Sequence, residues 1–356
     1  MMNQEEDCHI SKKKTHYPIS ITLLAYLTKY NRALALPLAY DDLMRFDEVI
    51  PLRDLKLKKD TLWNTALYSS SESTHIFEGL KQIYSILKTG GDTKVHKHLQ
   101  IERVDYCTFG NSHPFRVKIV NNFNDVYDYF YIKRADSSRV FGLELEDMLS
   151  PSRINFFATQ DCLVEEHIPG IPGDVFIAQH LLDKDYNQKR IAKEFVKFNE
   201  RCFVRLLGDM RSYNYVLDIT PDFEDPQFRI RAIDFDQQCY EGRKNVYLPQ
   251  FFKENKVLVD LVQLHFNAKV VQQYQSEERT LIARRIVAAK EQLTDLFAAL
   301  QNEPLAPPDK ITDLQHEIEK HFKLEKFSNH QSMSEIVKRV LEYVVDNYSS
   351  EKVKLS

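Results

Sequence analysis

Apolar and polar positions follow two different rhythms along this chain of 356 residues. Near the N-terminus, apolar residues recur every three or four positions within 21–30 and again within 74–88, which predicts two amphipathic helices, the first capped by Ser20. The stretch between them, which ends in the serine-rich run SSSES, is expected to be a loop. Gly90 and Gly91 mark the end of the second helix. The rhythm then changes to short runs rich in Val, Ile, Phe and Tyr that are separated by turn residues, which predicts antiparallel strands. These runs are 101–106, 115–120 and 126–133.

The second half of the chain returns to helical spacing after one more strand. A helix that begins near Ser138 is followed by a strand at 161–168 and by the proline-glycine segment PGIPGD. Helical periodicity is strongest over 189–203. Two extended segments then flank the turn TPDFEDP, and the remainder reads as helical. Its main helices are expected at 276–300 and after the capping box Ser332–Glu335.

Composition narrows the class of protein. Hydrophobic residues make up 43% and charged residues 28% of the chain, as in folded globular proteins. The net charge of -4 provides no basic footprint, so we expect no nucleic-acid partner. The five cysteines are scattered and odd in number, which favours reduced thiols over disulfides or a zinc site. Because the N-terminus lacks a signal sequence and no apolar run is long enough to span a bilayer, we expect a cytoplasmic protein.

Two segments carry the side chains that phosphoryl transfer requires. In LLGDMRSYNYVLD, Asp209 and Asn214 stand five residues apart and precede an extended run. In RIRAIDFDQQ, Asp234 ends an apolar strand. Transfer from ATP needs a group that orients the attacking hydroxyl and oxygen ligands for Mg²⁺, and Asp and Asn supply both. Taken singly, Asp209 and Asp234 could equally be an ordinary helix end and an ordinary strand end.

The order Asp-x-x-x-x-Asn, hairpin, Ile-Asp-Phe resembles the catalytic and metal-binding loops of protein-kinase-like enzymes. The Gly-Asp opening is similar to aminoglycoside phosphotransferases and lipid kinases. The resemblance covers about residues 100–245 and implies that Asp209 is the catalytic base, with Asn214 and Asp234 as ligands of Mg²⁺. It also implies that Arg211 touches the transferred phosphate, although Arg211 could instead pair with a neighbouring carboxylate.

The same resemblance assigns roles upstream. Lys133 matches the phosphate-binding lysine on the third strand of the small lobe, and Glu144 is our choice over Glu146 for its partner on the next helix. The loop TFGNSHP corresponds to the phosphate-cradling loop, and LVEEHIPGIPGD resembles the hinge of small-molecule kinases, where backbone groups meet adenine. The further nucleotide-binding residues implied in these two segments are Gly110, Ser112, Glu165, Glu166 and His167.

The predicted fold is α+β, of the protein-kinase-like two-lobe type. A helical N-terminal extension (1–95) precedes a small antiparallel β lobe (96–168) and a large helical lobe (169–356). The predicted function is transfer of the γ-phosphate of ATP to a hydroxyl, most simply of a small molecule, with ATP and Mg²⁺ as cofactors. One alternative is a pseudokinase that binds nucleotide without transfer, which the single glycine of the phosphate loop favours. Another is an AMP transferase on the same fold.

Overall fold

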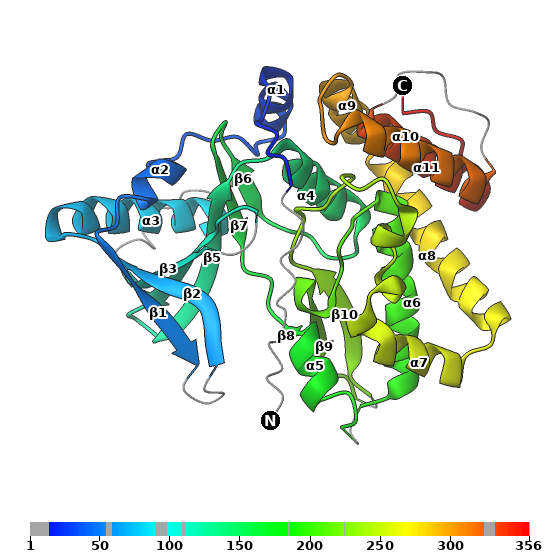
Figure 1. Cartoon of the computed structure of the whole chain (residues 1–356), viewed down its shortest axis with the longest axis horizontal. Coiled ribbons are helices and arrows are strands. Elements are labelled where there is room, and N and C mark those ends of the chain that lie inside the picture. The colour runs from blue at the N-terminus through cyan, green and yellow to red at the C-terminus, as the bar shows by residue number, and fades with distance from the viewer. Residues whose placement is uncertain are drawn as a thin grey trace, which may run out of the picture. The chain divides into compact units, whose positions relative to one another are not determined.

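The computed structural model describes residues 14–54, 59–89, 98–108, 111–183, 186–223, 225–323 and 332–355. They form two compact units of an α+β protein, which confirms the predicted fold class (Figure 1). The sheet unit contains the residues up to Pro18, Asn31–Asp136 and Asn155–His167. The helical unit contains Ile19–Tyr30, Ser137–Ile154 and the residues from Ile168 onward.

The sheet unit is built on an antiparallel sheet with the strand order β1-β2-β3-β4-β5-β7-β6. The chain leaves the sheet after β5 and returns as β6, which forms the edge of the sheet. Strand β7 then inserts between β5 and β6 and pairs with both. The strands are β1 (Glu48–Asp54), β2 (Lys59–Leu67), β3 (Leu99–Cys107), β4 (Phe115–Asn121), β5 (Val126–Arg134), β6 (Phe156–Ala158) and β7 (Cys162–Glu166). The three strands predicted after residue 100 are therefore confirmed.

One face of this sheet carries the core of the unit. Phe115, Val117 and Ile119 alternate along β4 and are fully buried, as the period of two requires. Helices α2 (Tyr40–Leu43) and α3 (Ser70–Thr89) contribute buried side chains to the same cluster. Residues on the opposite parity, among them Arg116 and Lys133, point to the other face and carry the polar groups of the sheet.

The N-terminal region contains helices, as predicted, and also two strands that the hydrophobic pattern did not predict. Strands β1 and β2 extend the sheet, and β2 pairs with β3, where Trp63 lies opposite Cys107. The serine-rich run expected to be a loop instead begins α3. Strand β2 is stabilised by pairing with β3, about forty residues later in the chain. The local pattern of apolar residues cannot reveal so distant a partner.

The helical unit surrounds a small antiparallel sheet with the order β10-β9-β8. Its strands are β8 (Ile171–Pro172), β9 (Tyr215–Thr220) and β10 (Gln227–Ala232). Its helices are α1 (Ile21–Lys29), α4 (Ser137–Leu149), α5 (Gly173–Gln179), α6 (Gln188–Arg205), α7 (Lys256–His265), α8 (Ala268–Ala288), α9 (Lys290–Leu300), α10 (Pro308–Phe322) and α11 (Met333–Tyr348). In the described part of the chain, no helix combines the length and apolarity that a membrane span requires.

Several helix boundaries follow from the sequence. The Ser20 hydroxyl accepts a hydrogen bond from the backbone N–H of Leu23, and Ser332 accepts one from Glu335, so both predicted caps are confirmed. The helix expected at 276–300 is divided by Ala289 into α8 and α9. The described cysteines are buried and carry free thiols.

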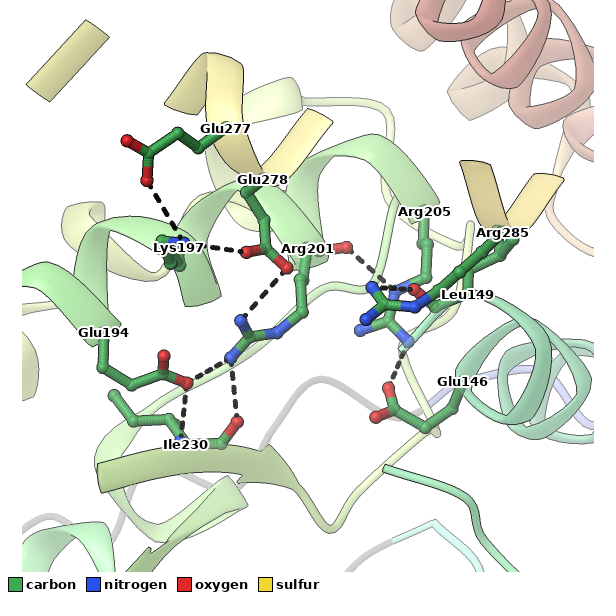
Figure 2. A network of polar contacts seen from close by, with 10 residues as sticks. All are labelled: Glu146, Leu149, Glu194, Lys197, Arg201, Arg205, Ile230, Glu277, Glu278 and Arg285. Atoms are coloured by element: carbon green, nitrogen blue, oxygen red, sulfur yellow. Dashed lines mark hydrogen bonds and ion pairs between the residues drawn. The ribbon is translucent and has the colours of Figure 1, made fainter. Parts of the chain in front are cut away.

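Buried charges fix helix α6 within the helical unit (Figure 2). Arg201 is 2% exposed, and its guanidinium donates to the Glu194 carboxylate at 2.6 Å, to Glu278 at 3.4 Å and to the carbonyl of Ile230 at 3.1 Å. Glu194 also accepts the backbone N–H of Ile230 at 3.0 Å. A single arginine therefore ties α6 to α8 and to β10.

A second guanidinium acts one turn later on the same helix. Arg205 pairs with Glu146 of α4 and donates through its Nε to the carbonyl of Arg201. Arg285 of α8 donates to the carbonyl of Leu149 at the end of α4 (Figure 2). Because a buried charge is costly unless it is paired and hydrogen-bonded, these contacts define one arrangement of α4, α6 and α8.

We expect Arg201→Met to lower the free energy of unfolding by about 3–5 kcal/mol, because it leaves Glu194 and Glu278 buried without their common cation. Lys256→Gln is the control, since the Lys256–Asp260 pair lies in solvent and contributes little. Denaturant titration measures both changes. Equal losses in the two variants would contradict a special role for the buried network.

Candidate active site

The candidate site begins where α6 ends. Leu206 closes the helix with a left-handed backbone (φ 53°), and Leu207 forms a β-bridge with Gln238. The N–H of Gly208 then donates to the carbonyl of Gln237 at 3.1 Å. A Cβ on Gly208 would lie 2.9 Å from that same oxygen, so the close approach of the two chain segments requires glycine. This contact explains the Gly-Asp opening seen in the sequence.

Asp209 has a strained backbone that the loop holds in place. Its φ of 57° is in the left-handed region, which Asp tolerates better than most residues. Its N–H donates to the carbonyl of Val246, and its own carbonyl accepts from the N–H of Arg211 at 2.8 Å and from the Asn214 amide at 2.7 Å. Its carboxylate accepts from Arg211 Nε at 2.9 Å and faces the Asn214 amide nitrogen at 3.4 Å.

Burial raises the pKa of the Asp209 carboxyl above its ordinary value of 3.8. The hydrogen bond and the positive charge of Arg211 lower the pKa in part, whereas the carboxylates of Asp234 and Glu254 raise it. The folded protein therefore holds this proton more tightly than the unfolded chain does. The contribution of Asp209 to stability is accordingly lost as the pH rises past 3.8, a cost typical of functional groups.

Asn214 and Asp234 meet at one end of the β9–β10 hairpin. Tyr215 pairs with Ala232 in the hairpin register, and just beyond them the N–H of Ile233 donates to the carbonyl of Asn214 at 3.0 Å. The Asn214 side chain donates its amide N–H groups toward Asp209, which leaves its side-chain oxygen with no donor among the described residues. One oxygen of Asp234 accepts the N–H of Asp236 at 3.0 Å.

These oxygens fit a magnesium ion that is shared with phosphate. Mg²⁺ is held by one or two carboxylates together with substrate oxygens and water, and only seldom by a complete protein cage. Asp234 provides the carboxylate, and the side-chain oxygen of Asn214 is available as a neutral ligand. Among the described residues, this site included, no group of three or more His, Cys, Asp or Glu side chains could hold a metal alone, so substrate oxygens and water would have to complete the coordination here.

The residue that follows Asp234-Phe235 is anchored to α4. Asp236 occupies the place where the resembling family carries glycine, and its carboxylate forms a buried ion pair with Arg139 of α4. Because the N–H of Asp236 also donates to Asp234, the ion pair fixes the loop that carries the candidate metal ligand.

Two residues that sequence reasoning missed support the loop. Asn255 is fully buried and donates to the carbonyls of Met210 and Pro249, while it accepts the hydroxyl of Tyr215 at 2.8 Å. Glu254 accepts from Arg211 at 2.8 Å. Both lie some forty residues after the loop and resemble ordinary polar residues at a helix start, so no sequence signal marks them.

Lys133 lies in the sheet unit, near the end of β5. Its ammonium donates to Glu165 of β7 at 2.7 Å, so the sheet unit itself provides a carboxylate for this lysine. In the helical unit, Glu144 accepts from Tyr26 of α1 at 2.8 Å and from Gln292 of α9 at 3.1 Å. The alternative partner, Glu146, pairs with Arg205. The predicted pairing of Lys133 with Glu144 would join the two units and stays a prediction.

The predicted hinge residues end the sheet unit. Glu165 and Glu166 close β7, and the unit ends at His167. The backbone N–H of Glu166 donates to the carbonyl of Asn155, and the Glu166 carboxylate accepts from the backbone N–H of Asn155. Burial lowers the pKa of His167. The remaining expected nucleotide contacts lie in the loop before β4, where Ser112 is 8% exposed and Gly110 falls outside the described residues.

The predicted site residues therefore fall into two sets. Asp209, Arg211, Asn214 and Asp234 gather around one loop of the helical unit. Lys133 and Glu165 lie diagonally across the paired strands β5 and β7 of the sheet unit, and Glu166 and His167 follow at the end of β7. Each set is assembled within its own unit, from segments that are distant in sequence.

Comparisons with known proteins add little to this picture. No family model and no curated protein matches the sequence. Among solved structures, the autoinhibited serine kinase domain of the giant muscle protein titin is similar to this chain, with 12% identity and a TM-score of 0.26. The similarity spans 71% of this chain and 89% of that chain. The function must accordingly be argued from the residues of this chain.

The charges around Asp209 predict opposite effects of two substitutions. Arg211→Ala removes the group that lowers the pKa of the Asp209 carboxyl, so the pKa should rise further. Asp234→Asn removes a negative neighbour, so the pKa should fall. The ¹³C chemical shift of the Asp209 carboxyl carbon, followed against pH, measures both. Shifts in the same direction in the two variants would contradict this electrostatic account.

Proposed function

We propose that this chain is an ATP-dependent phosphotransferase of the protein-kinase-like type. It moves the γ-phosphate of ATP to a hydroxyl, most simply of a small molecule, with the help of Mg²⁺. The observation that carries the proposal is the meeting of Asp209, Asn214 and Asp234 around one loop, although Asp234 is separated from the other two by a complete hairpin. A carboxylate beside a pair of metal ligands is the arrangement that phosphoryl transfer uses.

Asp209 acts as the base in this proposal. It accepts the proton of the acceptor hydroxyl while the hydroxyl oxygen bonds to the γ-phosphorus and the bond from that phosphorus to ADP breaks. Its raised pKa makes the carboxylate a better proton acceptor than an exposed Asp. Asn214 and Asp234 hold the metal, which when bound neutralises charge on the phosphates.

The sheet unit supplies the nucleotide contacts. Along the chain, its strands β3, β4 and β5 are followed by α4 of the helical unit and then by its strands β6 and β7, which is the order that the resemblance implies for the small lobe. Lys133, near the end of the third of these strands, holds the phosphates. The backbone near Glu165–His167, where the chain passes out of the sheet unit, meets adenine.

Arg211 receives a different role from the one first expected. Its guanidinium already donates to Asp209 and to Glu254, and it lies over the ring of Phe252 at 5.0 Å. Arg211 therefore orients the Asp209 carboxylate and sets its charge, in place of a direct contact with the transferred phosphate. This role agrees with the alternative in which Arg211 pairs with a neighbouring carboxylate.

The pseudokinase and the AMP transferase remain the competing functions. Incubation with ATP labelled in either the α- or the γ-phosphate separates all three, because only γ-label moves in a kinase and only α-label moves in an AMP transferase. A protein that binds ATP but moves neither label across a broad panel of hydroxyl compounds is a pseudokinase. The acceptor, a cytoplasmic location and the lack of a nucleic-acid partner stay predictions from the sequence.

Asp209→Asn should lower turnover by about 10²–10⁴-fold, the usual contribution of a positioned general base. Asn tolerates the left-handed backbone at this position, so the loop geometry is retained. ATP affinity, measured by calorimetry, should change little, because the groups proposed to hold the phosphates and the metal are intact. Full turnover in a variant with the wild-type melting temperature would make Asp209 structural.

Asp234→Asn should raise the Mg²⁺ concentration needed for half-maximal turnover, because a neutral amide binds Mg²⁺ more weakly than a carboxylate. The amide oxygen can still accept the N–H of Asp236, which preserves the loop. Asp260→Asn, which changes an exposed carboxylate on α7, is the matched control. An unchanged Mg²⁺ dependence in Asp234→Asn would remove Asp234 from the metal site.

A further inference from the structure

The ammonium of Lys133 has a single hydrogen-bond partner among the described residues. It donates to one oxygen of Glu165 at 2.7 Å, and its side chain is 9% exposed. Burying an ammonium is costly unless it is paired, so Glu165 accounts for the presence of the charge there. An ammonium has three N–H donors, and two of them remain for a ligand.

The pair is built into the sheet. In the register of β5 and β7, Tyr131 lies opposite Glu165 and Lys133 lies opposite Leu163. Lys133 and Glu165 are therefore diagonal neighbours on one face of adjacent strands, where long side chains reach each other. Strand β7 is itself paired on both sides, with β5 and with β6, so the backbone beneath Glu165 is fixed.

Glu165 can also accept a further hydrogen bond. Its other carboxylate oxygen is buried and has no hydrogen-bond donor among the described residues, and the residue is 3% exposed. A buried acceptor without a partner is unusual in a native protein and indicates a site that a ligand or a water completes. Glu165 can thus keep Lys133 in place while a second donor arrives.

Glu144 of α4, the glutamate predicted from the sequence as the partner of Lys133, has contacts within the helical unit. It accepts hydrogen bonds from the hydroxyl of Tyr26 on α1 and from the side-chain amide of Gln292 on α9. These two bonds connect α4 to α1 and α9.

We infer that Glu165 is the positioning residue for Lys133, in the role that the resembling family gives to a glutamate of the following helix. The inference rests on the proposed function, because it concerns the lysine that would hold the phosphates of ATP. Its consequence is that the phosphate-binding lysine is oriented by a strand of its own unit.

The test compares the affinity of ATP with that of adenosine, measured by calorimetry, because the ratio isolates the phosphate contacts. Lys133→Met should weaken ATP about tenfold relative to adenosine, since a hydrogen bond to a charged group contributes about that factor. Glu165→Gln should reduce the ratio by a similar amount. In the double variant Lys133→Met/Glu165→Gln, the second change should add nothing, because Glu165 acts only through Lys133.

Two controls accompany the cycle. Glu102→Gln breaks a lysine–glutamate pair between neighbouring strands of the same sheet, Lys118–Glu102 at 2.7 Å, and should leave the ratio unchanged. Glu144→Gln tests the rival assignment and should lower the melting temperature without changing the ratio. If Glu165→Gln unfolds, Glu165→Asp retains the charge on a shorter side chain and should still reduce the ratio.

The outcomes separate the two proposals. Additive effects of Lys133→Met and Glu165→Gln, or a ratio that falls in Glu144→Gln and not in Glu165→Gln, would overturn the role of Glu165 and leave the proposed function intact. A wild-type protein that binds neither ATP nor adenosine would overturn the proposed function, and the inference with it.

Discussion

The structure of the helical unit depends on the way α6 is held at its C-terminal end. Arg201 and Arg205 bury their guanidinium groups there and bind carboxylates from α6, α8 and α4. A helix fixed by such charges cannot rotate without leaving a buried ion unpaired, which is far more costly than the loss of a surface contact. The turn that follows, Leu206–Asp209, therefore starts from a defined position and can hold left-handed backbone at two residues.

The loop that carries Asp209 is also held in place. Backbone hydrogen bonds hold the loop after α6 against the segment 237–239. The side-chain amide of Asn255 donates to the carbonyl of Met210 in the same loop. The same loop then enters the hairpin whose far strand delivers Asp234. Asp209 and Asp234 are thus brought together by backbone pairing and not by attraction, because two carboxylates repel each other. Burial is the main cause of the raised pKa of Asp209, and the negative charge of Asp234 raises it further.

Sequence reasoning succeeded where the information is local. The strands after residue 100, the apolar face of α6 and the caps at Ser20 and Ser332 all follow from spacing and residue type within a dozen positions. The ion pair between Lys133 and Glu165 was missed, because the register between β5 and β7 brings these side chains together and periodicity does not encode register. Asn255 was missed for the same reason, since its importance comes entirely from carbonyls that other segments expose.

The central claim is that one metal–nucleotide site lies at the end of the β9–β10 hairpin. Mn²⁺ in place of Mg²⁺ tests it most directly, because the paramagnetic ion broadens the NMR signals of groups near it. We predict that Mn²⁺ together with ATP broadens the side-chain amide signals of Asn214 and the carboxyl signal of Asp234, and leaves those of Asn347 and Asp260, on α11 and α7, sharp. Broadening that spares Asn214 and Asp234 would contradict the account.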